Sequence, residues 1–344
     1  MTIDPSPRYR RSTIEDVAAH AQVSRAAVSK VLRNAYGVSD DMRERVTRSI
    51  EALQYRPRIS ARGMRGSTFT LGVAINDPAN AFMTDVLAGA TAETAGSPFQ
   101  IIIAVLDDPR GSSYRAIESL YDRQVDGILA ISPLAQMEWL EDMARKVPLV
   151  QLGSHDGSEQ YDTIVGDDAE GVRLMMRHLM DLGHTRIAHV THTDPDWVRS
   201  PNRPHIIRET HYRRIMHEAG LDDEITVVPA MFEDHAAYDE MRVRFADPGF
   251  RPTAIFAGND DAALGVMRAA SEFPDLDRLS IAGYDDSHLS THPRIGLTTI
   301  SQQGGAMGRR AVQLLLERVE GRTESRYVEM PARLVVRSST FPAA

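Results

Sequence analysis

The stretch TIEDVAAHAQVSRAAVSKVLRNAYGVSDDMRERVTRSIEALQYRPRISARGMRG, residues 13–66, decides the fold of the N-terminal part of the chain. Its first apolar residues follow the i, i+3, i+4, i+7 spacing of one helix face: Ile14, Val17, Ala18 and Ala21. Ser24 is a good N-cap for a second helix, whose inner face carries Val28, Val31 and Leu32. Two short helices joined by a tight turn predict a helix-turn-helix.

A third helix is expected to start near Ser39. Asp40 and Asp41 fall in its first turn, where the helix dipole favours carboxylates. Its core face is predicted from Val46, Ile50 and Leu53, and Pro57 ends it because proline disfavours helix in the preceding residue. The first sixty residues therefore predict a small all-α head.

This stretch resembles the DNA-binding head of the LacI/GalR family of bacterial regulators. The resemblance is carried by T-I-x-D-V-A, by V-S-x-x-x-V-S-x-V-L, by V-S at the third helix and by L-x-Y-x-P. It implies binding of double-stranded DNA at a palindromic operator. Gln22 departs from the glycine most often found in the turn, so it has to adopt a left-handed backbone at roughly 1 kcal/mol.

In this family the second helix enters the major groove, and its first, second and sixth residues face base edges. Those residues are Arg25 and Lys30, which can donate to guanine, and Ala26, which can contact a thymine methyl group. The alternative is that Arg25 and Lys30 contact only phosphates. Three serines are expected to contact phosphate, which positions the head without specifying sequence: Ser24, Ser29 and Ser39.

Residues 58–66, RISARGMRG, match the family's hinge, which is expected to fold into a short helix only on DNA. The resemblance implies DNA contacts by Arg58, Ala61 and Met64. Met64 occupies the position of a leucine that wedges into a central minor-groove step. Methionine is apolar and flexible, so it can fill the same role less rigidly.

Length and charge separate this head from the rest of the chain. At 344 residues the chain suits two or three domains. Residues 1–66 hold 13 basic and 7 acidic residues, a net charge of +6, whereas the remainder holds 26 basic and 41 acidic residues, a net charge of −15. A basic head on an acidic body is typical of a nucleic-acid-binding domain fused to a sensor or an enzyme.

From residue 69 onwards, short apolar runs alternate with helical segments. The runs expected to be strands are 71–75, 100–106, 126–132, 148–153, 186–192, 253–258 and 279–285. The expected helices lie near 82–95, 113–124, 136–146, 169–183, 209–220, 260–272 and 304–320. Such alternation predicts parallel, doubly wound α/β sheets, and so many residues suit two lobes around a cleft. The layout resembles the periplasmic-binding-protein-like core of the same family. The predicted domains are residues 1–57 (the helix-turn-helix head), 58–68 (the hinge) and 69–344 (the effector-binding and dimerisation core).

Polar residues follow several of these strands, where ligands bind in such sheets. The family's motifs P-T-A-x-x-x-x-N-D, G-Y-D-D and L-T-T-I-x-Q match here, and Arg208 matches R-x-x-G-Y except that His211 replaces the glycine. The residues expected to bind the effector are Asp167, Arg208, Asn259, Asp260, Asp285 and Gln302. An arginine fork beside carboxylates and amides suits vicinal hydroxyls. Asp260 has helix capping as its alternative role.

Three aromatic residues are further candidates for contact with the effector: Phe82, Trp197 and Phe232. An aromatic ring can stack on a sugar face, although a core position at a helix start explains Phe82 equally well. The histidines at positions 189, 192, 205 and 211 match no metal motif, because the first two are predicted to face opposite sides of a strand and the others to lie in an irregular or helix-start region.

Several classes of protein are excluded or disfavoured. The chain has no cysteine, so disulfides, thiolate zinc sites and thiol nucleophiles are ruled out. No apolar run approaches a membrane span, and the N-terminus lacks the apolar region of an export signal, so we expect a cytoplasmic protein. Phosphate-loop, nucleophile-elbow, zincin and dinucleotide-binding motifs are absent, and no cofactor or metal is expected.

The sequence is therefore interpreted as a transcriptional regulator and not an enzyme. We expect a repressor that forms a dimer or a tetramer and responds to a sugar or sugar derivative. A nucleobase effector is the first alternative, because purine binders share this core. A solute-binding module and a sugar-modifying enzyme are alternatives from other classes, but neither needs residues 13–66.

Overall fold

The computed structural model describes residues 12–32, 35–55, 67–105, 114–192, 200–231 and 233–343. The chain divides into two compact units, Met1–Thr68 and Phe69–Ala344. Five predicted site residues lie outside the described residues: Arg58, Ala61, Met64, Trp197 and Phe232.

The first unit, here called the head, contains three described helices: α1 (Ile14–Ala21), α2 (Arg25–Leu32) and α3 (Asp40–Ala52). Thr13 and Asp16 form a capping box at the start of α1, and Ser39 caps α3 by accepting a hydrogen bond from the Met42 amide. The buried residues that hold the three helices together are Val17, Ala18, Ala21, Val28, Val31, Val46 and Tyr55. The expected helices of the head are therefore present.

The second unit has two lobes. The N-lobe contains a parallel six-stranded sheet of order β11-β5-β4-β3-β1-β2. Its strands are β1 (Thr70–Ile75), β2 (Gln100–Val105), β3 (Gly127–Ile131), β4 (Leu149–Leu152), β5 (Asp162–Gly166) and β11 (Tyr327–Met330). Its helices are α5 (Ala81–Thr94), α6 (Tyr114–Asp122), α7 (Met137–Ala144) and α12 (Gly304–Val319). Helices α5 and α12 share one apolar cluster with the sheet, and α6 and α7 share another.

The C-lobe contains a parallel four-stranded sheet of order β7-β6-β8-β9 and a two-stranded antiparallel sheet, β10-β12. The strands are β6 (Ile187–Thr191), β7 (Thr226–Pro229), β8 (Ala254–Ala257), β9 (Ser280–Ala282), β10 (Thr299–Ser301) and β12 (Arg333–Val335). The α-helices are α8 (Asp168–Asp181), α9 (Pro204–Glu218), α10 (Asp234–Ala246) and α11 (Asp260–Ala270), and the 3-10 helices are Asp222–Glu224, Pro274–Leu276 and His288–Thr291. Helices α10 and α11 share one cluster with the sheet, and α8 and α9 share the other.

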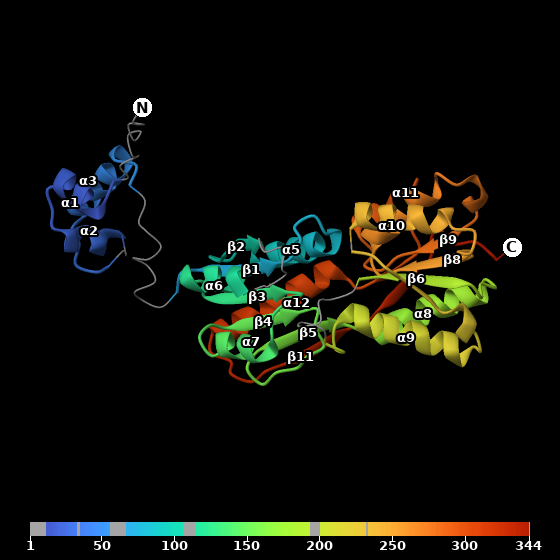
Figure 1. Ribbon diagram of the computed structural model, residues 1–344. Helices are drawn as coiled ribbons and strands as arrows, with labels where there is room; N and C mark the ends of the chain where they lie inside the picture. The colour runs from blue at the N-terminus through green and yellow to red at the C-terminus, as the bar shows by residue number, and fades with distance from the viewer. Residues whose placement is uncertain are drawn as a thin grey trace, which may run out of the picture. The chain divides into compact units, whose positions relative to one another are not determined.

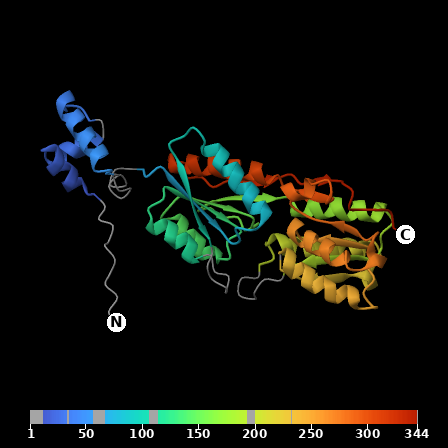
Figure 2. The same ribbon diagram turned by 90° about the horizontal axis from the view of Figure 1, so that it is seen from above.

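The described chain passes between the lobes three times. It leaves the N-lobe between β5 and α8, returns between β10 and α12, and leaves again between β11 and β12. Figures 1 and 2 both show the consequence, because the red α12 lies among the blue and green elements of the N-lobe. Each lobe is thus built from separate stretches of sequence.

The predicted strands and helices of the core are all present, with bounds shifted by a few residues, and the α/β two-lobed fold is confirmed. The sequence interpretation missed β5, β7, α10 and the last three strands. It also started α9 too late, because the helix begins at Pro204 and not near 209. His205 therefore lies at the start of α9 and His211 in its middle, so the helix-start alternative holds for His205 and neither residue lies in an irregular segment.

Candidate functional site

The tight turn between α1 and α2 has the backbone that the sequence required. Gln22 has φ 52° and ψ 47°, in the left-handed region, so the residue pays the conformational cost that a glycine would avoid. Ser24 Oγ accepts the Ala27 amide at 3.1 Å, which caps α2. Val28 is fully buried between the helices. The inner face of α2 thus packs in the core of the head, and its outer face is exposed to solvent.

The predicted DNA-contacting residues that the structure describes lie on the surface of the head. Arg25, Ala26 and Lys30 are exposed on α2, whose first residue is Arg25. The Arg25 guanidinium lies 3.2 Å from Glu15 Oε1, but its side chain is 71% exposed. The three serines are exposed or half-buried: Ser24, Ser29 and Ser39. This face can meet a nucleic acid without unfolding any part of the head.

A cavity of about 440 Å³ lies between the two lobes of the core. The N-lobe lines it with Asn76, Asp77, Asn80, Phe82, Met83, Ser132, Leu134, Leu152, Gly153, Gly166 and Met307. The C-lobe and the crossing segments line it with Asp168, His192, Arg203, Pro204, His205, Arg208, Met231, Glu233, Asn259, Asp285 and Gln302. This mixture of apolar walls and a few polar groups is typical of a small-molecule site.

Arg208, on α9, is held on three sides. Its Nε donates to Asp168 Oδ1 at 2.7 Å, a second guanidinium nitrogen donates to the Gly258 carbonyl at 2.6 Å, and the guanidinium lies 3.7 Å from the centre of the Tyr284 ring. Burial alone would lower the pKa of Arg208, but Asp168 raises it above its usual value. Arg208 is therefore a permanently charged, preoriented donor at the cavity wall.

Asp168 is the first residue of α8 and is 1% exposed. Burial would raise its pKa, but Arg208 and His155 hold that pKa below the usual value. His155 Nε2 lies 2.8 Å from Asp168 Oδ2, so the two carboxylate oxygens have different partners. The sequence places Asp168 beside Asp167 at a strand end, but neither Asp168 nor His155 is among the predicted effector contacts.

Asp285, Gln302 and Asn259, three of the residues predicted to bind the effector, all line the cavity. Gln302 Nε2 donates to Asp285 Oδ1 at 2.6 Å, and Asn259 caps α11 by accepting the Ala262 amide at 2.9 Å. Asp285 has φ 127°, a conformation that L-residues rarely adopt. Burial and the nearby Asp260 carboxylate raise the pKa of Asp285 well above its usual range, which favours the uncharged acid.

Two predicted effector contacts require correction. Asp167 does not line the cavity, because its side chain turns back to cap α8 by accepting the Glu170 amide at 3.0 Å; Asp168 lines it instead. Asp260 also does not line the cavity. Its two oxygens accept from Thr299 Oγ1 at 2.6 Å and from the Ser287 amide at 2.8 Å, and Asn259 takes the capping role. Burial raises the pKa of Asp260 to about 6.

The remaining predictions divide between rings that reach the cavity and rings that do not. Phe82, at the start of α5, lines the cavity and also packs against the apolar cluster of the N-lobe. The rings of His192 and His205 line it with their centres 5.5 Å apart, whereas His189 is fully buried and stacks on Phe256. Among the described residues, no group of three or more histidines and carboxylates could hold a metal ion. None of the described helices is long and apolar enough to cross a membrane.

Two family profiles match the sequence. The one described as "Bacterial regulatory proteins, lacI family" matches residues 13–58, and "Periplasmic binding protein-like domain" matches residues 176–340. Catabolite control protein A of Priestia megaterium is 31% identical over 336 residues, covering 95% of this chain and 99% of that protein. The HTH-type transcriptional repressor PurR of Vibrio campbellii is 31% identical, covering 95% of this chain and 98% of that protein. The ribose operon repressor of Escherichia coli is 30% identical, covering 90% and 93%.

Solved structures show the same fold. The transcriptional regulator CelR in complex with cellobiose superimposes with a TM-score of 0.66 at 27% identity, covering 96% of this chain and all of the other. The lac repressor dimer bound to operator and the anti-inducer ONPF gives a TM-score of 0.76 at 24% identity, with the same coverage of both chains. The two-unit architecture is thus shared over almost the whole length.

Proposed function

This chain belongs to the lacI family of bacterial regulatory proteins and is a DNA-binding transcriptional regulator, and we propose that a sugar or sugar derivative in the interlobe cavity controls its affinity for a palindromic operator. The observation that carries the proposal is the 440 Å³ cavity with Arg208 fixed at its wall. The relatives named above are repressors, so the chain is a regulator and not an enzyme.

The proposed DNA contacts come from α2, from its cap and from the cap of α3. Arg25 and Lys30 donate to guanine, Ala26 contacts a thymine methyl group, and phosphates are held by Ser24, Ser29 and Ser39. The hinge residues Arg58, Ala61 and Met64 are proposed to enter the minor groove between the two heads. One head supplies too few base contacts for a unique site, so two heads on a palindrome are needed.

The chemistry of the cavity favours an uncharged, hydroxyl-rich ligand. Asp168 and Arg208 balance each other's charge, and the raised pKa of Asp285 favours its neutral form. Together with Asn259 and Gln302 they offer donors and acceptors at one wall, and Phe82 offers a flat apolar ring at another. Two of the similar proteins are named for sugars, ribose and cellobiose, which supports the same class here.

A nucleobase is the second candidate. The rings of Phe82, His192 and His205 all line the cavity, and a planar base can stack on such rings as well as a sugar can. The Arg208 guanidinium could donate hydrogen bonds to the ring atoms of a base as it could to the hydroxyls of a sugar. The ligand screen below distinguishes the two classes.

A homodimer is the proposed assembly, and a tetramer is its alternative. Strand β2 lies at the edge of the N-lobe sheet, and it carries Ile103 at 49% and Val105 at 42% exposure. An open strand edge with exposed apolar side chains is a surface that a second copy would cover. A regulator of bacterial transcription acts on the chromosome, so we assign it to the cytoplasm.

A thermal-shift screen of D-ribose, cellobiose, other sugars, polyols and nucleobases tests the effector. A ligand at 100 times its dissociation constant stabilises the folded protein by about 2.7 kcal/mol, which a melting curve detects. The bound ligand should then lengthen the lifetime of a closed core and change binding to an operator selected from random duplex DNA. A chain that binds operator but none of these compounds would contradict a sugar or nucleobase effector.

Asp285→Asn identifies the site. The variant keeps the shape of the side chain but replaces an acceptor oxygen by a donor, so effector affinity should fall at least tenfold, with folding retained. Asp286→Asn is the matched control, because the adjacent Asp286 accepts from Arg337 at 2.6 Å and does not line the cavity. Normal effector binding by Asp285→Asn, measured by calorimetry, would remove Asp285 from the site.

A further inference from the structure

A loop of the N-lobe reaches the C-lobe beside the cavity. The loop joins β4 to β5, and its residues His155 and Asp156 make three hydrogen bonds to the C-lobe. His155 Nε2 lies 2.8 Å from Asp168 Oδ2, the His155 amide donates to the Asn202 carbonyl at 2.9 Å, and Asn202 Nδ2 donates to Asp156 Oδ1 at 2.6 Å. We call these four residues, His155, Asp156, Asp168 and Asn202, the interlobe bracket.

The two ring nitrogens of His155 connect different lobes. Nε2 faces Asp168 at the start of α8, and Nδ1 lies 3.3 Å from the Tyr327 hydroxyl on β11. An imidazole that donates from Nε2 to Asp168 and accepts at Nδ1 from the Tyr327 hydroxyl satisfies both contacts. The His155 and Asp168 side chains are 14% and 1% exposed, so water competes weakly for the bond between them, whereas Tyr327 is half exposed.

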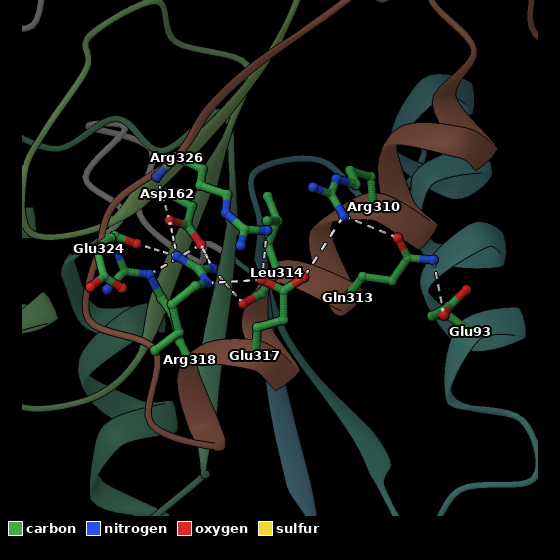
Figure 3. Close-up of polar contacts among 10 residues, drawn as sticks. Glu93, Asp162, Arg310, Gln313, Leu314, Glu317, Arg318, Glu324 and Arg326 are labelled. Carbon is green, nitrogen blue, oxygen red and sulfur yellow. Dashed lines mark hydrogen bonds and ion pairs between the residues drawn. The ribbon is translucent and has the colours of Figure 1, made fainter.

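Tyr327 is a firm anchor because the start of β11 is fixed by a buried charge cluster, drawn in Figure 3. Asp162, at the start of β5, is fully buried and accepts the Arg326 amide at 2.8 Å. Arg318 lies 3.1 Å and Arg322 2.5 Å from the Asp162 carboxylate. The backbone of Tyr327, the next residue, is therefore held against the N-lobe sheet.

On its other side the bracket ends at the cavity. Asp168 uses Oδ2 for His155 and Oδ1 for the Nε of Arg208. The other two contacts of Arg208, with Gly258 and Tyr284, both lie in the C-lobe. The path Tyr327–His155–Asp168–Arg208 is thus a continuous chain of polar contacts from the N-lobe to the proposed effector-binding arginine.

We propose that His155 is a positioning residue that makes the orientation of Arg208 depend on how the two lobes are arranged. When the lobes separate, His155 withdraws from Asp168, and the carboxylate that fixes the Arg208 guanidinium loses its contact with the N-lobe. By linkage, an effector that needs Arg208 in its fixed orientation binds the closed core better and favours closure. The inference rests on the proposed function, because it assigns His155 a role at the proposed effector site.

A second contact between the lobes provides a contrast. Asp261 Oδ2, in the first turn of α11, lies 3.3 Å from both Asn80 Nδ2 and the Ala81 amide at the start of α5. This contact also joins the lobes, but none of its atoms touches Arg208 or Asp168. Loss of the Asp261 contact leaves the His155–Asp168 contact in place, so it should disturb Arg208 less than loss of the His155 side chain does.

The test needs no effector and uses the full-length chain. Because the chain has no cysteine, Glu138→Cys on α7 and Asp239→Cys on α10 give two exposed spin-label sites, one on each lobe, without background labelling. Pulsed electron–electron double resonance reports the interlobe distance distribution. The NMR signal of the Arg208 Nε–H group is assigned by its loss in Arg208→Lys. The rate at which this hydrogen exchanges with solvent reports whether the guanidinium keeps its bond to Asp168.

Four substitutions are compared: His155→Ala, His155→Gln, Tyr327→Phe and Asp261→Asn. His217→Ala is the matched control, because His217 forms a similar pair with Asp222 at 2.6 Å on the exposed end of α9. We expect His155→Ala to raise exchange at Arg208 Nε–H about tenfold or more and to broaden the distances to longer values. Glutamine can donate to Asp168, so His155→Gln should restore both signals. Tyr327→Phe should act in the same direction as His155→Ala, more weakly.

The exchange rate at Arg208 and the interlobe distances together decide the proposal. Unchanged exchange at Arg208 in both His155→Ala and Tyr327→Phe would overturn the proposal, and so would faster exchange without any change in the distances. An equal effect of Asp261→Asn on Arg208 would show that any loosening of the lobes suffices, which also overturns a specific role for His155. If His155→Ala does not fold, Tyr327→Phe gives the same decision. A failed ligand screen would contradict the proposed effector class and leave these measurements unaffected.

Discussion

Two arginine–carboxylate pairs in this molecule use the same chemistry in opposite surroundings. In the head, Arg25 lies 3.2 Å from Glu15, and the two side chains are 71% and 60% exposed. In the core, Arg208 lies 2.7 Å from Asp168, and the two side chains are 7% and 1% exposed. Water screens the first pair, so it opens easily; burial limits the access of water to the second pair, so neither partner is easily replaced. The exposed arginine is available to a new partner, whereas the buried one is held in place for a ligand that comes to it.

The comparison is tested most strongly by breaking the buried pair. Asp168→Ala leaves the Arg208 charge buried without its carboxylate, so the free energy of unfolding of the core should fall by about 3–5 kcal/mol. Urea unfolding followed by circular dichroism measures the loss. Asp234→Ala is the control, because its partner Arg268 is 47% exposed, and that change should cost less than about 1 kcal/mol. Similar losses for the two variants would show that burial does not distinguish the pairs.

The exposed arginine should affect recognition and leave stability alone. Arg25→Ala is expected to weaken binding to the selected operator by about 1–3 kcal/mol and to relax the preference at one base pair. Its unfolding curve should nearly match that of the parent protein, because the Arg25 side chain is 71% exposed and its ion pair with Glu15 lies at the surface. Arg48→Ala, which removes an exposed arginine from α3, serves as the control. If scrambled DNA loses as much affinity as the operator, then Arg25 contacts only phosphate.

Lowering the pH should destabilise the core, where histidines are buried. Burial lowers the pKa of His189 from its usual 6.5 to about 4, so the unfolded chain takes up a proton before the folded chain does. The stability that the neutral ring contributes is therefore present at pH 7 and is lost as the pH falls from about 6.5 towards 4. From His189 alone the free energy of unfolding should be about 2 kcal/mol lower at pH 5 than at pH 7.

His189→Gln isolates this contribution. His178 and His184 also have pKa values lowered by burial and act in the same direction, so the parent and the variant must be compared at both pH values. The variant should lose less stability than the parent between pH 7 and pH 5. An identical loss in both proteins would mean that His189 does not carry the acid sensitivity.

The smallest expected effect belongs to the exposed pair itself. Glu15→Gln removes the carboxylate that competes with DNA for Arg25, at a cost to the stability of the head of less than about 1 kcal/mol. Operator affinity should rise slightly in low salt, and the gain should vanish as salt screens the pair. Fluorescence anisotropy at two salt concentrations measures it. A loss of operator affinity would show that Glu15 helps to orient Arg25 for its base.

The head could be predicted closely from the sequence because its signals are local. Ser39 caps α3, Gln22 takes the left-handed turn, and the spacing of Val17, Val28 and Val46 sets the core. In the core the alternating runs sufficed for the fold class. Helix α10 was missed because its surface is strongly polar, although its buried residues Ala237, Met241 and Phe245 recur every fourth position.

The site was predictable only in part. The sequence shows that polar residues follow the strands, but it does not show which of two adjacent polar residues faces the cavity. Asp167 and Asp168 are adjacent, and the start of α8 decides between them: Asp167 caps the helix and Asp168 turns to Arg208. His155 had no signal at all. It comes from a loop between two strands, and only the folded chain brings it to Asp168.

The three passages of the chain between the lobes have a consequence for synthesis on the ribosome. Strand β11 and helix α12 complete the N-lobe, and β12 contributes to the C-lobe, yet all three come after residue 303. Until they emerge, one edge of β5 has no neighbouring strand, and the apolar face that α12 covers is open to water. The nascent protein therefore exposes apolar surface until these three segments leave the ribosome, after which both lobes can close. On a ribosome stalled before residue 304, the edge of β5 and the apolar face that α12 covers would stay exposed. Such a chain is expected to bind chaperones.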